Sequence, residues 1–312
     1  MKNGIVVIGA VFVDVKGYPL DKYIPGGRNA GRVVQVHGGV ARNVAEDIAN
    51  LELRPTFITV VDDNGTGRDV VEKLEEHKVN MEYCRRAPGG TGTWLAVFDN
   101  TGDVVASISR RPDVSAILEI LESRGEEIFA EADSVAVEVD MDEAVVKAVL
   151  RLAEKYGKPV YALVSNMSIA VQRRDFLRRV DCLVCNEQEA GLFFSGEILD
   201  LAPELLAFQL AERIRAGELR RMVVTMGPRG SVYADADGNY GAVPALGVDV
   251  VDTTGCGDAF FSGVCVGLTY GKSLEESCRI GTRLAASVIA TRENVCPRFL
   301  PAEFGLPDRN SP

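Results

Sequence analysis

The sequence predicts an α/β fold in which a doubly wound, mostly parallel sheet is flanked by helices and carries a small second sheet as a lid. Three observations predict it. Short apolar, β-branched runs recur along the chain, segments of helical spacing separate most of them, and two stretches rich in Gly and Pro interrupt the alternation. Continuous apolar strands that alternate with helices are what a parallel sheet covered on both faces requires.

Six apolar runs predict buried strands. They lie at 5–11, 56–61, 134–139, 159–164, 180–186 and 222–226. Between them, three segments show helical spacing, at 66–78, 142–156 and 203–216. The N-terminal stretch MKNGIVVIGAVFVDV already carries Asp14, and no run of small residues suggests cleavage, so we interpret it as a strand and not as a signal peptide.

The two interrupting stretches lie at 15–36 and 84–111. Their turn dipeptides and alternating extended pieces predict a small antiparallel sheet that projects from the main domain, with ordinary surface hairpins as the equal alternative. Because the chain has no repeat and no long linker, we expect residues 1–312 to form a single domain with this lid inserted.

Composition restricts the possible partners. Lys and Arg number 34 against 45 Asp and Glu, a net charge of −11, which disfavours nucleic acid and anionic membranes. No apolar run reaches the ~18 to 20 residues of a membrane helix. Seven cysteines without a secretory signal indicate reduced thiols and a cytoplasmic protein. Cys182 and Cys185 lie within an apolar run and are expected to be buried strand thiols.

The segment VDTTGCGDAFF, which ends at Phe261, is the most informative motif. Gly255, Cys256 and Gly257 form a turn that leads into a helix, so their amides and the helix N-terminus would attract an anion. Asp258 beside such a site is suited to act as a general base for phosphoryl transfer to an alcohol. The alternative is that Asp258 is a helix N-cap.

Three further motifs lie at strand or helix ends. In VHGGVARN, Gly38 and Gly39 precede a helix whose first turns carry Asn43, a bifunctional amide suited to a polyol. In CNEQEA, Asn186 and Glu189 could face one cavity and hold hydrated Mg²⁺. Their spacing also fits a capping box, which local pattern favours.

The last motif is TMGPRG at the end of a predicted strand. Thr225, Gly227 and Gly230 could bring a hydroxyl and backbone donors to a nucleotide, and a tight hairpin is the equal alternative. No GxGxxG, Walker A lysine or GxSxG elbow competes with these four motifs.

In this order, GGVARN, NEQE, TMGPRG and DTTGCGDAF resemble the signatures of the ribokinase family of carbohydrate kinases, also named for the minor phosphofructokinase. The resemblance spans nearly the whole chain, including Asp14 at the end of the first strand and the lid. It implies a ribokinase-like fold and an ATP- and Mg²⁺-dependent kinase, and many members also bind a monovalent cation such as K⁺. It further suggests a homodimer formed through the lid.

The resemblance assigns roles by position. Asp258 would deprotonate the acceptor hydroxyl, and the amides of Gly255, Cys256 and Gly257 would stabilise charge on the phosphoryl group. Sugar hydroxyls would be bound by Asp14, Gly38, Gly39 and Asn43. ATP would be contacted by Asn186, Thr225, Gly227 and Gly230. Cations would be held by Glu189 and Asn186 (Mg²⁺, through water) and by Asp252 and the Thr254 carbonyl (the monovalent ion).

Substrate choice depends on fewer residues. GGVARNVAE and the lid stretch around Trp94 are most similar to pseudouridine kinases, which makes pseudouridine the first candidate. Arg42 would contact the substrate or be a solvated helix residue, Glu138 could bind a further hydroxyl, and Trp94 could stack on a base or merely pack. Alternatives are a kinase of a free sugar (ribose, fructose or a ketodeoxy acid) and a non-catalytic sensor of sugar or nucleotide.

Two departures from the family pattern stand out. Cys256 occupies a position that is usually Ala, and a thiol at a helix N-terminus is expected to be unusually reactive. The segment YALVSNMSIAV, residues 161–171, lacks the aspartate that many relatives carry after this strand.

Overall fold

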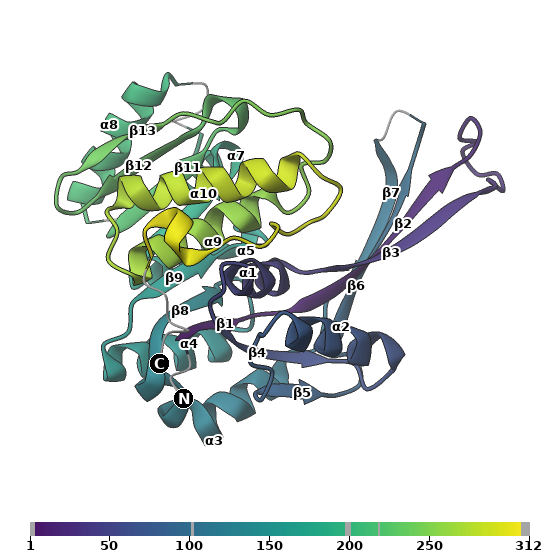
Figure 1. The fold of residues 1–312 in the computed structure, drawn as a ribbon, viewed down its shortest axis with the longest axis horizontal. Helices are drawn as coiled ribbons and strands as arrows, with labels where there is room; N and C mark the ends of the chain where they lie inside the picture. The colour runs from purple at the N-terminus through teal and green to yellow at the C-terminus, as the bar shows by residue number, and fades with distance from the viewer. Residues whose placement is uncertain (1–3, 101–102, 197–200, 218, 307–312) are drawn as a thin grey trace.

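The computed structural model describes residues 4–100, 103–196, 201–217 and 219–306, and it confirms the predicted α/β sheet with a lid (Figure 1). The main sheet has nine strands in the order β13-β12-β11-β10-β9-β8-β1-β4-β5. In this order, every neighbouring pair between β11 and β5 is parallel. β12 pairs antiparallel with both β11 and β13. The strands are β1 (Gly4–Ile8), β4 (Thr56–Val61), β5 (Cys84–Arg86), β8 (Ala132–Glu138), β9 (Val160–Leu163), β10 (Cys182–Asn186), β11 (Arg221–Thr225), β12 (Ser231–Asp235) and β13 (Tyr240–Val243).

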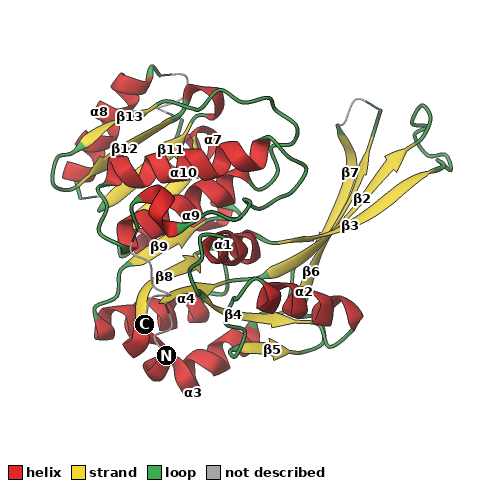
Figure 2. Ribbon diagram, viewed as in Figure 1, coloured by secondary structure: helices red, strands yellow, loops and turns green. Residues whose placement is uncertain are grey.

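Helices cover both faces of this sheet (Figure 2). Alternate strand residues supply the two cores: Ile5 and Val7 of β1 join one, while Val6 and Ile8 join the other. The first core packs on α1 (Val40–Ala49), α2 (Gly65–Glu76), α9 (Cys256–Thr269) and α10 (Leu274–Ile289). The second packs on α3 (Ser115–Glu131), α4 (Glu143–Tyr156), α5 (Met167–Ala170), α6 (Arg174–Leu177), α7 (Glu187–Phe193) and α8 (Pro203–Arg215).

The lid is a second sheet in the order β3-β2-β6-β7, which projects from the main body in Figure 1. Its strands are β2 (Val11–Pro19), β3 (Gly31–Gly38), β6 (Thr91–Phe98) and β7 (Val104–Arg110). It is mixed rather than antiparallel, because β2 and β6 run parallel. Residues 84–86 are not part of it, since β5 pairs with β4 in the main sheet. Residues 101 and 102 of the expected lid lie outside the described residues.

Asp14 also differs from its expected place. The first strand ends at Ile8, and after Gly9 and Ala10 the chain continues into β2, so Asp14 lies within a lid strand. The register pairs Asp14 with Val36 of β3 and Trp94 of β6. The apolar run at 5–11 therefore joins two sheets, which sequence periodicity does not reveal.

The topology places a crevice beside the end of β1. The chain builds β4 and β5 on one side of β1 and β8 to β11 on the other, and ligands of such sheets bind at the carboxyl ends of the strands near this reversal. Helices α1 and α9 pack against each other on the same face. Their N-termini thus approach the crevice together.

The cysteines and the apolarity of the helices agree with the sequence. Cys182 and Cys185 are buried in β10, as expected, and all seven cysteines are free thiols. No helix in the described ranges combines the length and the apolarity needed to cross a membrane.

Candidate active site

A cavity of about 920 Å³ lies where the lid meets the carboxyl ends of the main strands. This is near the upper end of the range for small-molecule sites, about 300 to 1,000 Å³. The lid, the ends of β8 and β9, and the first turns of α1 and α9 all contribute walls. Its polar lining includes Asp14, Asn43, Ser109, Arg111, Asp113, Glu138, Asp140, Ser165, Asn166, Arg173, Asp258 and Asn294.

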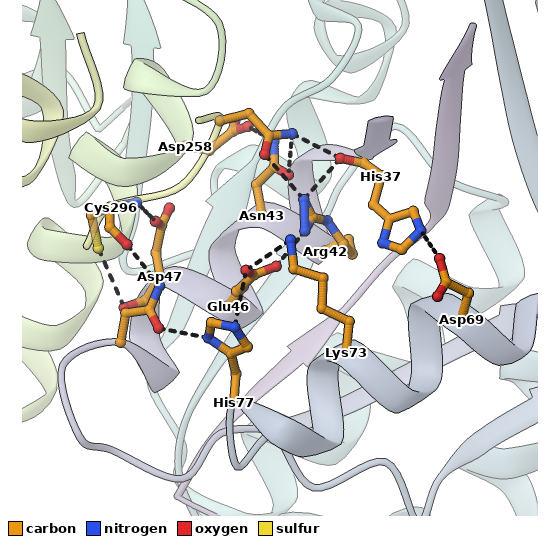
Figure 3. A network of polar contacts seen from close by, with 12 residues as sticks. His37, Arg42, Asn43, Glu46, Asp47, Asp69, Lys73, His77, Asp258 and Cys296 are labelled. Atoms are coloured by element: carbon orange, nitrogen blue, oxygen red, sulfur yellow. Dashed lines mark hydrogen bonds and ion pairs between the residues drawn. The ribbon is translucent and has the colours of Figure 1, made fainter. Parts of the chain in front are cut away.

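Asp258 lies in the first turn of α9 and faces this cavity (Figure 3). The N-cap position belongs to Gly255, so the alternative that Asp258 caps the helix is wrong. Its Oδ2 accepts a hydrogen bond from Asn43 Nδ2 at 2.6 Å. Burial raises the pKa of Asp258 to about 6, while the Asn43 amide and the Arg42 charge act in the opposite direction.

Gly255 and Gly257 of this turn are glycine for different structural reasons. Gly255 has φ +80°, and a Cβ there would lie 2.0 Å from the carbonyl oxygen of Asn294, so the fold itself requires glycine. A Cβ on Gly257 would meet no heavy atom within 4 Å among the described residues. Packing does not require glycine at this second position, which fits a helix N-terminus that a ligand approaches closely.

Cys256 lies at the first position of α9. Burial and the nearby Asp258 carboxylate raise the pKa of its thiol, which opposes the extra reactivity expected at a helix N-terminus. The reactivity of this thiol therefore stays a prediction. The amide of Cys256 donates to the Thr253 carbonyl at 3.3 Å and so also takes part in the turn.

The lid supplies a cross-strand row to the cavity. Asp14, Trp94 and Ser109 are register neighbours on β2, β6 and β7, and all three line the cavity. Burial raises the pKa of Asp14. A Cβ on Gly38 would lie 2.9 Å from an Asp14 carboxylate oxygen, so glycine there makes room for this side chain.

Gly39 and Glu138 hold the strand ends together. Gly39 has φ +99°, and a Cβ there would lie 2.7 Å from the Ala10 carbonyl oxygen. The buried Glu138 carboxylate accepts the backbone N–H groups of Ala10 at 3.3 Å and Ala41 at 3.1 Å. Burial raises the pKa of Glu138 to about 8. Glu138 therefore organises the cavity wall, a role that sequence pattern does not show.

Arg42 is placed differently from either expectation. Its side chain is 1% exposed, so it is not solvated, and it does not line the cavity. It pairs with Glu46, one turn along α1, and donates to the His37 carbonyl and to Asn294. Figure 3 shows Arg42 beside Glu46, and neither residue of this buried pair lines the cavity.

Asn186 and Thr225 end neighbouring strands and are register partners, so the structure brings these two predicted nucleotide contacts together. Asn186 and Glu189 form the capping box of α7, with reciprocal hydrogen bonds of 2.8 Å. The box uses one carboxylate oxygen, and burial raises the pKa of Glu189.

The TMGPRG segment is a hairpin. β11 turns through a 3₁₀ segment, Gly227–Arg229, into antiparallel β12. A Cβ on Gly230 would lie 2.1 Å from the Val243 carbonyl oxygen, so packing requires this glycine. At Gly227, φ is +56° and a Cβ would meet nothing within 4 Å in the described structure.

Asp252 and Thr254, the residues proposed to hold a monovalent cation, lie beside the glycine turn that leads into α9. Asp252 Oδ1 accepts the Thr254 amide at 2.8 Å, and the amide of Asp252 donates to the Ile289 carbonyl. Thr254 lines the cavity. These contacts fix the loop that enters α9.

Several polar residues of the cavity wall were not among the predicted site residues. Asp140 is buried after β8, and its carboxylate accepts the amide of Ser165 at 3.0 Å and its hydroxyl at 2.7 Å. Asp140 thus brings a carboxylate from the neighbouring strand to Ser165 of the 161–171 segment. Its position after a strand end is a signal that could have found Asp140, whereas Asn294 lies in a loop with no local signal.

Comparisons with known proteins give one consistent result. The model of the pfkB family carbohydrate kinases matches residues 2–297. A guanosine-inosine kinase from Exiguobacterium acetylicum is 33% identical over 96% of this chain and 99% of its own. A pseudouridine kinase from Escherichia coli (strain K12) is 28% identical over 89% and 88%. The Arabidopsis thaliana ribokinase structure complexed with ribose and ATP matches with a TM-score of 0.84 at 21% identity, covering 97% and 99%.

Proposed function

The chain belongs to the pfkB family of carbohydrate kinases and is a phosphotransferase of the sugar and nucleoside kinase type, and on that premise we propose that it transfers the γ-phosphoryl group of ATP to the primary hydroxyl of a ribonucleoside. The observation that carries the proposal is the position of Asp258. A carboxylate with a raised pKa faces a large cavity from the N-terminal turn of a helix.

The chemistry follows from this position. Asp258 accepts the proton of the acceptor hydroxyl as its oxygen bonds to the γ-phosphorus, and the bond to the bridging oxygen of ADP breaks. Asn43 holds Oδ2 of Asp258, which leaves Oδ1 for the hydroxyl. The first amides of α9 and its dipole stabilise the negative charge of the migrating group.

The residues present fit ATP and Mg²⁺. Gly257 leaves the approach to the helix N-terminus open, and Asn186 and Thr225 lie together at the same edge of the sheet. Glu189 has one carboxylate oxygen outside the capping box for metal-bound water. When bound, Mg²⁺ neutralises phosphate charge. Asp252 and the Thr254 carbonyl remain the proposed site of a monovalent cation.

The acceptor follows from the cavity. Asp14, Gly38, Gly39 and Asn43 would bind ribose hydroxyls close to Asp258. Beyond them the cavity continues to Asp140, Ser165 and Asn166, so it extends past the groups that a single sugar ring would use. Trp94 on the lid offers an aromatic face for a base.

Guanosine and inosine head the list of acceptors, because the relative named for them shares 33% identity against 28% for the pseudouridine kinase. Pseudouridine, the first candidate from the motifs, comes second. All three are ribonucleosides with a lactam edge, which the Asn166 amide and the Asp140–Ser165 pair could meet with donors and acceptors.

We also propose a homodimer formed through the lid. The lid face opposite the cavity carries an apolar cross-strand row of Val15, Leu95 and Ile108, of which Leu95 is 41% and Ile108 70% exposed. Exposed apolar rows of this kind suit burial against a second copy. Light scattering of the purified protein tests this, with a monomer mass at micromolar concentration as the contrary result.

The test of the proposed function is ADP formation with ATP, Mg²⁺ and a panel of guanosine, inosine, pseudouridine, ribose, fructose and a ketodeoxy sugar acid. We expect kcat/KM for at least one ribonucleoside to exceed that for every free sugar by ~100-fold or more, because base contacts add binding energy. A free sugar as the preferred acceptor would overturn the nucleoside assignment. Binding of nucleoside and ATP without turnover would instead support a sensor.

A further inference from the structure

We propose that Arg42 and Asn294 are positioning residues that orient and tune Asp258 through a one-directional hydrogen-bond relay across Asn43. The inference rests on the proposed role of Asp258 as general base. It gives a new role to Arg42, which is buried and does not line the cavity, and to Asn294, which was not among the predicted site residues.

The relay has three steps, and Figure 3 shows Arg42, Asn43 and Asp258 of it. Arg42 Nη2 donates to Asn294 Oδ1 at 3.3 Å, Asn294 Nδ2 donates to Asn43 Oδ1 at 3.3 Å, and Asn43 Nδ2 donates to Asp258 Oδ2 at 2.6 Å. A guanidinium has donors only, so the atom of Asn294 that faces it must be the oxygen. Each later amide is then forced to present its nitrogen toward Asp258.

A second acceptor fixes the same orientation. The His37 carbonyl accepts from Arg42 Nη2 at 2.8 Å and from Asn294 Nδ2 at 2.8 Å. A flipped Asn294 would turn its oxygen toward this carbonyl and toward Asn43 Oδ1, where oxygen would face oxygen. The amide orientation is therefore determined twice, once by the cation and once by the carbonyl.

The loop that carries Asn294 is itself held in place. The Asn294 carbonyl packs on Gly255, where no side chain would fit. Two residues further on, the amide of Cys296 donates to the buried Asp47 carboxylate at 2.7 Å. The relay therefore connects elements whose backbones cannot move independently.

Charged groups surround both ends. Arg42 is balanced by Glu46, and Glu46 also faces Lys73 of α2 and His77, the residue that caps the C-terminus of α2. His37, beside Arg42, pairs with Asp69 of α2. Three carboxylates interact electrostatically with Asp258: Glu189 of α7, Glu138 of β8 and Asp47 of α1. The thiol of Cys256, on α9 itself, also interacts with it.

Among these groups, Arg42 is the cation that acts on Asp258. Its charge and the Asn43 hydrogen bond lower the pKa of Asp258, whereas burial and Glu189 raise it. The Asn43 hydrogen bond and the Arg42 charge thus favour the ionised form of the base, against its burial. The Nε atom of Arg42 is buried and has no hydrogen-bond partner among the described residues, so the ion pair with Glu46 does not use every donor of the guanidinium.

The test compares pH profiles of kcat. R42M/E46M removes the buried pair as a unit, which avoids leaving one buried charge alone. N294L breaks the middle step without changing charge. K73M removes a cation that faces the same Glu46 from outside the relay and serves as the matched control. A carbon-13 NMR titration of Asp258, assigned with D258N, reads its pKa without turnover.

We expect the acid limb of kcat to move upward by ~0.5 pH unit or more in R42M/E46M and in N294L. It should stay unchanged in K73M, and R42K, which keeps the charge, should retain most of the wild-type profile. R42M/E46M/N294L should shift the limb no further than R42M/E46M, because one broken step already uncouples the relay.

Lower kcat with an unmoved acid limb would show a merely structural role and overturn the proposal. Additive shifts in the triple variant, or an equal shift in K73M, would do the same. If R42M/E46M does not fold, N294L alone decides. If the wild type phosphorylates none of the acceptors, the proposed function fails, and the NMR titration still tests the relay.

Discussion

The side-chain amide of Asn43 donates to Oδ2 of Asp258 at 2.6 Å, and this hydrogen bond joins two helices, α1 and α9, whose N-terminal turns meet at the cavity. It selects one carboxylate oxygen and leaves the other for an acceptor hydroxyl. The two residues are 215 positions apart in the chain. The site therefore exists only because the sheet topology brings both helix starts to the same crevice.

Replacing Asn43 by Ala should lower kcat at pH 7 by ~10-fold or more and move the acid limb upward, because the hydrogen bond from Asn43 that lowers the pKa of Asp258 is lost. The pH profile of kcat measures both effects. Asn50→Ala is the control, since that amide lies on the same chain segment and donates to the Cys296 carbonyl outside the cavity. An unmoved limb in Asn43→Ala would contradict the prediction.

Gly255→Ala and Gly257→Ala should separate folding from phosphate binding. The first places a Cβ 2.0 Å from a carbonyl oxygen at φ +80° and should cost ~2 kcal/mol or more of unfolding free energy. The second meets no heavy atom of the described residues within 4 Å and should leave stability nearly unchanged while raising KM for ATP or lowering kcat. Urea unfolding and steady-state kinetics distinguish them, and a fully active Gly257→Ala would argue against a phosphate approach there.

Trp94→Ala should raise KM for the preferred nucleoside by ~10-fold, since a base stacked on an aromatic ring is worth about 1 to 3 kcal/mol. KM for ATP should not change. Tyr18→Ala is a matched control, because Tyr18 stacks on Phe98 in the same lid without lining the cavity. Equal effects of the two variants on KM would show that Trp94 only supports the lid.

Glu138→Gln should flatten the pH dependence of stability. Folding raises the pKa of Glu138 to about 8, so its contribution is fully present below the ordinary glutamate pKa and is lost as pH rises through 8. In this window the group reduces the unfolding free energy by up to about 1.4 kcal/mol per pH unit. Thermal unfolding between pH 5 and 9 should show a smaller decline in the variant. An identical decline would place the ionised form in the folded protein.

The sequence predicts the parts of this protein that depend on local pattern. The buried strands from 56–61 to 222–226 are recognisable because both of their faces are apolar, and the helices between them by their spacing. The turn before Asp258 is recognisable because glycines and an acid occur at a helix start. The cavity end that carries Asn43 and Asp258 could be proposed for the same reason.

What the sequence does not predict depends on register and long-range partners. Asp14 belongs to the lid because β2 pairs with β3 and β6, and no periodicity marks the break after Ile8. Arg42 and Glu46 have the spacing of a helical ion pair, yet no local pattern marks the hydrogen bond of Arg42 with Asn294, 252 residues away. The sequence suggests Glu138 as a ligand of a substrate hydroxyl, but it does not predict the two backbone amides, of Ala10 and Ala41, that donate to this carboxylate.

The measurement that tests the central claim most directly is the turnover of Asp258→Asn with ATP and the preferred nucleoside. Loss of the base should lower kcat by ~10³-fold or more, about 4 kcal/mol of transition-state stabilisation, while ATP binding measured by calorimetry persists. Asparagine keeps the size of the side chain and its place beside Asn43. Turnover within ~10-fold of the wild type would contradict the assignment of Asp258 as the base.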